Sequence, residues 1–114
     1  MTDCLFCKIV NHEIPAQAVY EDDDIFAFED INPQAPVHIL IIPKEHFASL
    51  NDVPEKKQDI LGRLLIQAKR IAREKGLRER GYRIVLNTET DSGQEVFHIH
   101  FHLLGGRRMT WPPG

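Results

Sequence analysis

Three histidines alternate with apolar residues in the segment HIHFHLLGG, which begins at His98. Successive side chains on a β-strand point to opposite faces, so the spacing predicts that His98, His100 and His102 share one face. Imidazole titrates near neutral pH and can act as a nucleophile, a proton donor or a proton acceptor. The segment therefore predicts a catalytic strand rather than a solvated polar face, because reactive groups are best held on rigid elements.

The three histidines are too far apart to share one task. At about 3.3 Å per strand residue, neighbouring histidines lie roughly 6.6 Å apart at Cα and the outer pair about 13 Å apart. A metal ion with nitrogen ligands at about 2.1 Å could take an adjacent pair but not all three from a regular strand. We therefore expect the histidines to divide their roles.

Length and composition favour one domain over residues 1–114, since the chain is 42% hydrophobic and can bury a single core. The formal net charge of -3 argues against electrostatic capture of nucleic acid, while a single nucleotide in a pocket stays compatible. No apolar run approaches the ~20 residues that cross a bilayer, and the first residues do not form a signal peptide. We expect a cytoplasmic protein without a membrane partner, in which the C-x-x-C spacing of Cys4 and Cys7 indicates a metal or redox pair.

The elements that must position these residues follow from periodicity and turn signals. The predicted strands are 18–21 and 24–29 as a hairpin, the buried run 37–42, 82–87, and the histidine strand from 98. Residues 4–10 fit a turn of helix. Asp52 is expected to cap an amphipathic helix, with Glu55 closing a capping box, that runs about 22 residues to Gly76. His38 interrupts the buried run and so needs a polar partner.

Segments spread along the whole chain resemble the Hint branch of the histidine-triad superfamily. They are FCKIV, EIPA, AFEDINPQAPVHILIIPKEH, GYRIVLN, GQEVFHIHFHLLGGR and the final WPPG. The resemblance implies an α+β fold with an antiparallel sheet of about five strands and one main helix. It also implies a homodimer with a continuous sheet, and we expect Trp111 in the irregular tail to pack on this chain or on a partner.

The resemblance implies an activity as well. Members of the branch bind purine nucleotides and hydrolyse adenosine phosphoramidates to AMP and an amine. His100 would be the nucleophile that forms a nucleotidyl-histidine intermediate, later hydrolysed by water. His102 would contact the phosphate or orient His100, and His38 would bond to His100 and fix its tautomer. No catalytic cofactor is needed, because imidazole supplies both the nucleophile and the proton for the amine.

A further group of residues matches family positions around the nucleotide. Asp30 would accept hydrogen bonds from the ribose hydroxyls, because a carboxylate offers two acceptor oxygens. The turn at residues 92–95 is a candidate phosphate cradle, since glycine lets successive N–H groups face an anion. The predicted nucleotide contacts near the phosphate are Asn87, Gly93, Gln94 and Glu95, and the predicted walls of the adenine slot are Phe6, Ile9, Phe28, Ile31 and Leu40.

The resemblance also implies a metal site. Cys4, Cys7, His46 and His98 match a Cys2His2 set that some relatives carry. Four protein ligands leave no open position, so the ion would be a structural Zn²⁺. The alternative is two reduced cysteines without a metal, because occupancy depends on preparation and pH.

Two departures from the eukaryotic members leave the substrate open. Glu95 stands where those proteins carry a serine near the leaving group, and the acidic loop 88–92 replaces a more glycine-rich one, so negative charge lies near the phosphate. Three other functions compete with a phosphoramidate hydrolase: a nucleotide-binding regulator with incidental activity, a hydrolase with an open catalytic zinc, and a dinucleoside polyphosphate hydrolase. Four protein ligands argue against the open zinc, and the WPPG ending argues against the last.

Overall fold

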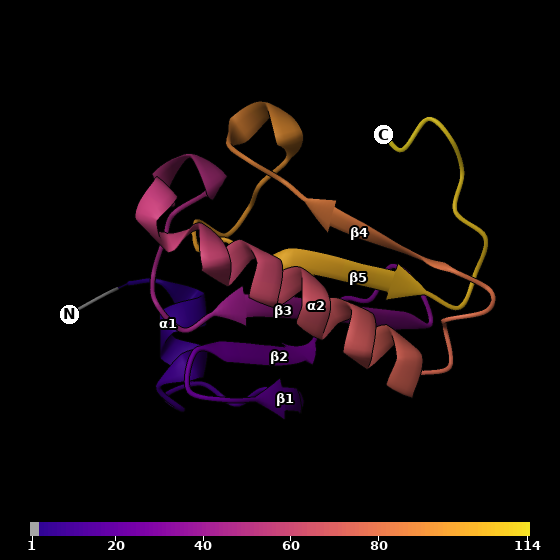
Figure 1. The fold of residues 1–114 in the computed structure, drawn as a ribbon, viewed down its shortest axis with the longest axis horizontal. Coiled ribbons are helices and arrows are strands. Elements are labelled where there is room, and N and C mark those ends of the chain that lie inside the picture. Colours follow the sequence, from indigo (N-terminus) through magenta and orange to yellow (C-terminus); the bar gives the residue numbers. More distant parts are fainter. Residues whose placement is uncertain (1–2) are drawn as a thin grey trace.

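The computed structural model describes residues 3–114 as an antiparallel sheet with one long helix across it. The strands are β1 (Ala18–Glu21), β2 (Ile25–Glu29), β3 (Val37–Pro43), β4 (Tyr82–Leu86) and β5 (Phe101–Gly105), and the helices are α1 (Leu5–Val10) and α2 (Gln58–Glu74). The five strands lie in the order β1-β2-β3-β5-β4, and α2 crosses one face of the sheet (Figure 1). The predicted α+β fold with five strands and one main helix is confirmed.

Alternation along the strands gives the sheet two different faces. Ile39 of β3 packs beneath α2 in the larger core, whereas its neighbour Leu40 packs with Phe6 of α1 on the other side. Leu40 is paired with His102 across β3 and β5. His38 precedes Leu40 by two residues, so both histidines lie on the face that α1 covers.

The long helix is shorter than the sequence predicts. Instead of one helix of about 22 residues capped by Asp52, the chain forms a 3-10 turn at Glu55–Lys57 and then the 17-residue α2. The predicted capping box of Asp52 with Glu55 is wrong, because Asp52 closes a capping box with Ser49 around a separate 3-10 turn, Leu50–Asp52. Pro54 explains the break, since it lacks an N–H and disfavours a helical conformation in the residue before it.

The histidine strand also begins later than predicted. β5 starts at Phe101, so the predicted start of this strand at His98 is wrong and His98 and His100 lie before the ladder, although the Phe6 ring still packs on both imidazoles. Hydrogen bonds outside the sheet explain the difference. The Ile99 N–H donates to the Phe47 carbonyl at 2.7 Å, the His98 imidazole donates to the Pro43 carbonyl, and the His100 imidazole donates to the His98 carbonyl. The remaining strands and α1 agree with prediction to within one residue at each end.

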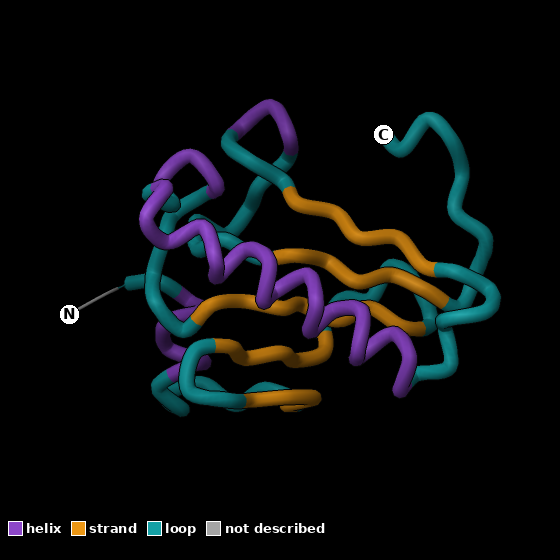
Figure 2. Tube along the Cα trace, in the orientation of Figure 1, coloured by secondary structure: helices purple, strands orange, loops and turns teal. Residues whose placement is uncertain are grey.

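The segment after β5 leaves the sheet as an irregular tail (Figure 2). Trp111 in this tail is 82% exposed and does not pack on the described part of its own chain, so the other expected alternative, packing on a partner, stays a prediction. Within residues 3–114, no helix has the length and apolar character needed to span a membrane.

Candidate active site and metal site

A pocket of about 550 Å³ opens on the face of the sheet that α1 covers. Most of the predicted site residues line it: Phe6, Ile9, Phe28, Asp30, Ile31, His38, Leu40, Asn87, Gly93, Glu95, His100 and His102. Sequence reasoning missed the lining residues Leu5, Ile14, Pro15, Ala16, Glu29, Asn32, Gln34 and Val96. Several of these residues belong to the segments EIPA and DINPQAP. The family resemblance of these two segments could have indicated that they line the pocket. The pocket is apolar beside α1 and polar beside the histidines.

His100 is held in one orientation at the polar end of the pocket. Its Nδ1 lies 2.8 Å from the His98 carbonyl oxygen, which can only accept, so Nδ1 carries the proton. The neutral ring therefore keeps its lone pair on Nε2. The Phe6 ring packs edge-on at 5.1 Å, and burial lowers the pKa of His100, which favours the neutral form. His100 thus has the protonation state that a nucleophile needs.

His38 is paired with His102 and not with His100. Its Nε2 lies 2.9 Å from Nδ1 of His102 and 3.5 Å from Oδ2 of Asp30, while Gln34 donates its backbone N–H to Nδ1 at 3.0 Å. The predicted bond between His38 and His100 is therefore wrong. The strand register explains this, because Leu40 pairs with His102 and brings His38 to the same side of the neighbouring strand. His102 in turn packs against the His100 ring at 4.9 Å between centroids.

Burial makes protonation of these imidazoles costly. The pKa of His102 is lowered to about 4, first by burial and then by the neighbouring imidazoles of His100 and His38. Burial also lowers the pKa of His38, and the Asp30 carboxylate opposes part of that shift. The site therefore holds neutral imidazoles near neutral pH, each with one proton to place.

The predicted metal ligands meet beside α1. Cys4 and Cys7 begin α1, His46 follows β3, and His98 precedes β5. His98 Nδ1 lies 3.2 Å from His46 Nδ1, 3.4 Å from Cys4 Sγ and 3.5 Å from Cys7 Sγ, and Cys7 Sγ lies 3.4 Å from His46 Nδ1. Tetrahedral zinc with standard bond lengths needs about 3.4 Å between nitrogens and about 3.6 Å between nitrogen and sulfur.

The protonation of His98 agrees with that geometry. Its Nε2 donates to the Pro43 carbonyl at 2.7 Å, which leaves the Nδ1 lone pair facing the cysteines. A backbone carbonyl on the far nitrogen is the usual outer partner of a metal-bound imidazole. The four residues therefore fit a closed, structural zinc site.

Gln94 differs from the other predicted contacts, because it is absent from the pocket wall and only 6% exposed. Its Oε1 accepts the Glu89 N–H at 2.8 Å, and its Nε2 donates to the carbonyls of Ala48 and Val96 at 2.8 and 3.1 Å. Gly93 beside it has φ of 88°, a conformation that favours glycine. This placement indicates that the Gln94 side chain braces the loop rather than contacting a ligand.

Comparison with known proteins extends these findings. The HIT domain family model matches residues 11–109. The chain is 54% identical to the 14 kDa zinc-binding protein of Brassica juncea, over 98% of this chain and 100% of that protein. It is 53% identical to Adenylylsulfatase HINT1 of Arabidopsis thaliana, over 96% of this chain and 76% of that protein. The solved HIT family hydrolase from Legionella pneumophila Philadelphia 1 has a TM-score of 0.96 at 59% identity, over 98% of this chain and 100% of that chain.

Proposed function

Because the chain belongs to the HIT domain family, in its Hint-like branch, we propose that it hydrolyses purine nucleoside phosphoramidates to AMP and an amine. One observation carries the proposal: the His98 carbonyl holds the proton of His100 on Nδ1, so Nε2 is free to attack phosphorus. The relatives named as a HIT family hydrolase and an adenylylsulfatase support hydrolysis of a bond to a nucleotide phosphate.

The reaction has two displacements at phosphorus. His100 Nε2 attacks, the bond between phosphorus and the amine nitrogen breaks, and the amine leaves with a proton supplied through His102. Water then attacks the nucleotidyl-histidine and returns a proton to His102, the bond between phosphorus and Nε2 breaks with its electron pair returning to Nε2, and AMP departs. His38 takes part through its contact with His102. These steps need no catalytic cofactor.

The pocket accommodates the nucleotide in this proposal. The apolar walls Phe6, Ile9, Phe28, Ile31 and Leu40 would enclose the adenine, and Asp30 would accept from the ribose hydroxyls. Asn87, Gly93 and Glu95 also line the pocket and would face the phosphate. Glu95 is exposed, so its negative charge would disfavour an anionic leaving group more than an amine.

We also propose a structural zinc ion, held by Cys4, Cys7, His46 and His98, that fixes the start of α1 without entering the reaction. Residues 1–114 would act as one HIT domain in the cytoplasm. A homodimer with a continuous sheet is supported by the position of β4 at the sheet edge, where a second copy could pair with it.

A nucleotide-binding regulator with incidental activity is the second candidate, and one experiment separates the two. AMP release from adenosine 5′-phosphoramidate is measured after prolonged chelation, for wild type and for His100→Asn. His12→Asn is the matched control, because His12 is exposed and lies outside the pocket wall. A hydrolase predicts turnover that survives chelation and His12→Asn but is lost in His100→Asn.

Three results would contradict the proposal. Turnover retained in His100→Asn excludes a histidine nucleophile at that position. Turnover lost on chelation, with the circular dichroism spectrum unchanged, brings the metal into the chemistry. Tight AMP binding with negligible wild-type turnover favours the regulator.

A further inference from the structure

The loop before β3 contributes a backbone amide to the histidine cluster. The N–H of Gln34 donates to Nδ1 of His38 at 3.0 Å. A backbone N–H can only donate, so Nδ1 must present a lone pair and cannot carry a proton. A neutral His38 therefore carries its proton on Nε2.

The tautomer of His38 also fixes the tautomer of His102. The proton on His38 Nε2 points to Nδ1 of His102, 2.9 Å away, with Oδ2 of Asp30 beside it at 3.5 Å. His102 accepts at Nδ1, so its own proton must lie on Nε2. We propose that the Gln34 amide is the positioning group that fixes both tautomers and makes His102 a proton donor toward the pocket. The tautomers do not depend on the proposed function; only the transfer of the His102 proton to the leaving amine rests on it.

The Gln34 amide also disfavours a second metal site, at Asp30, His38 and His102. Ligand atoms of Asp30, His38 and His102 lie within 4.8 Å of one another, close enough to hold a cation. Coordination at His38 Nε2 would displace its proton while Nδ1 still faces the Gln34 N–H, so neither ring nitrogen would be protonated. Zinc ligation uses neutral imidazole, in which the other nitrogen is a donor. The Gln34 amide therefore disfavours a metal ion at Asp30, His38 and His102 and leaves these groups available for proton transfer. The cluster around His98, by contrast, fits a metal ion.

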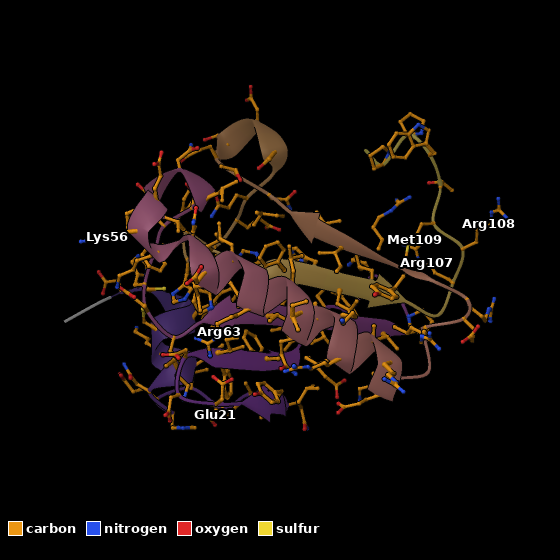
Figure 3. All side chains as sticks on the ribbon, in the orientation of Figure 1. Glu21, Lys56, Arg63, Arg107, Arg108 and Met109 are labelled. Atoms are coloured by element: carbon orange, nitrogen blue, oxygen red, sulfur yellow. The ribbon has the colours of Figure 1, made fainter. Side chains whose placement is uncertain are left out.

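The segment after β5 holds Gln34 in place. Arg107 donates from Nε to the Gln34 carbonyl at 3.0 Å, and the Gln34 side chain donates to the Asn32 carbonyl at 3.1 Å. Gly106 has φ of 91°, and a Cβ there would lie 2.8 Å from Pro36, so the tail packs closely on the loop. Figure 3 shows Arg107 in the tail that follows β5. Gln34, which lines the pocket, is thus held both by its own loop and by the tail.

Nitrogen NMR of wild-type protein labelled at histidine tests the inference without any substrate. Two-bond correlations distinguish the protonated from the unprotonated ring nitrogen in each imidazole. We expect His38 and His102 to be protonated at Nε2 at pH 7.5. A proton on Nδ1 of His38 overturns the proposal, whatever the enzyme does. The expected tautomers without phosphoramidate turnover would leave this inference intact and refute only the proposed function.

Two substitutions at one position supply the matched comparison. Gln34→Pro removes the amide donor, and Gln34→Ala removes the side chain but keeps the amide. We expect Gln34→Ala to keep the wild-type tautomer at His38. In Gln34→Pro we expect that tautomer to be lost and turnover to fall roughly 100-fold or more, the usual effect of losing an acid catalyst.

Metal binding gives a readout that loop damage alone would not produce. Titration with Zn²⁺ alone should show one more bound equivalent in Gln34→Pro than in Gln34→Ala. Equal zinc stoichiometry in two folded variants overturns the claim that the amide excludes a metal. Should Gln34→Pro fail to fold, the wild-type tautomers decide the proposal.

Discussion

Gln94 offers the sharpest test of how the loop beside the active site is held. The substitution Gln94→Leu keeps the approximate size of a side chain that is 6% exposed but removes its amide. Three backbone groups lose their partners: the N–H of Glu89 and the carbonyls of Ala48 and Val96. Leaving a buried polar group unpaired costs about 1 to 3 kcal/mol.

The expected loss of stability is smaller than the sum of three such penalties. Ala48 and Val96 are only half-buried, so we expect water to satisfy part of their carbonyls, and the leucine regains some apolar burial. We therefore expect the free energy of unfolding to fall by about 2 to 4 kcal/mol. For a chain of this size, this corresponds to a decrease in Tm of roughly 8 to 16 °C.

Urea unfolding of wild type and Gln94→Leu measures this difference directly. Gln17→Leu is the control, because Gln17 is exposed and should change stability by less than about 0.5 kcal/mol. If Gln94→Leu unfolds at the wild-type urea concentration while its AMP affinity falls tenfold or more, the reasoning is refuted. Gln94 would then contact the nucleotide directly, as the sequence pattern predicts.

Three further predictions address charge and metal. The pKa of His102 is lowered to about 4 in the folded protein, from 6.5. Between these pH values the unfolded chain binds more protons than the folded chain, so the free energy of unfolding should fall as the pH drops from 6.5 to 4. The fall should be at most about 1.4 kcal/mol per pH unit for this residue. Urea titrations at several pH values check this, and constant stability from pH 7 to 4 would exclude buried neutral imidazoles. Zinc removal should lower the Tm of wild type but not of Cys7→Ser, as scanning calorimetry with and without chelator would reveal. Glu95→Gln removes a negative charge from the pocket wall and should tighten AMP binding about 2- to 5-fold at low salt, with calorimetric titration at high salt showing a smaller gain.

Local patterns were sufficient to predict the strands of the sheet, whereas the residues of the pocket wall were predicted from the family resemblance. Alternating or continuous apolar runs identified the hairpin and β3, and the interruption of the β3 run predicted that His38 is buried and needs a polar partner. These signals are local because burial acts residue by residue along a strand. The family resemblance then brought distant residues such as Asp30 and His100 into one pocket.

The errors concern contacts between segments that are far apart in the chain. The partner of His38 depends on the register between β3 and β5, which no single strand encodes. The late start of β5 depends on hydrogen bonds to Pro43 and Phe47, more than fifty residues away. Gln94 is a polar residue in the turn before the histidines, as a ligand contact would be. Only the three-dimensional course of its loop shows that its amide faces inward.

Neighbouring histidines serve two sites where the chain enters β5. On a regular strand, His98 and His100 would point to the same face with their Cα atoms roughly 6.6 Å apart, a spacing that already favours separate roles. Before the strand begins, His98 turns its Nδ1 to the cysteines, while its carbonyl still accepts the proton of His100. Phe6, between those cysteines, packs on both imidazoles at 6.0 and 5.1 Å. A metal bound there would therefore stabilise the apolar wall of the pocket and the nucleophile together, so its loss should weaken purine binding before it slows the reaction at phosphorus.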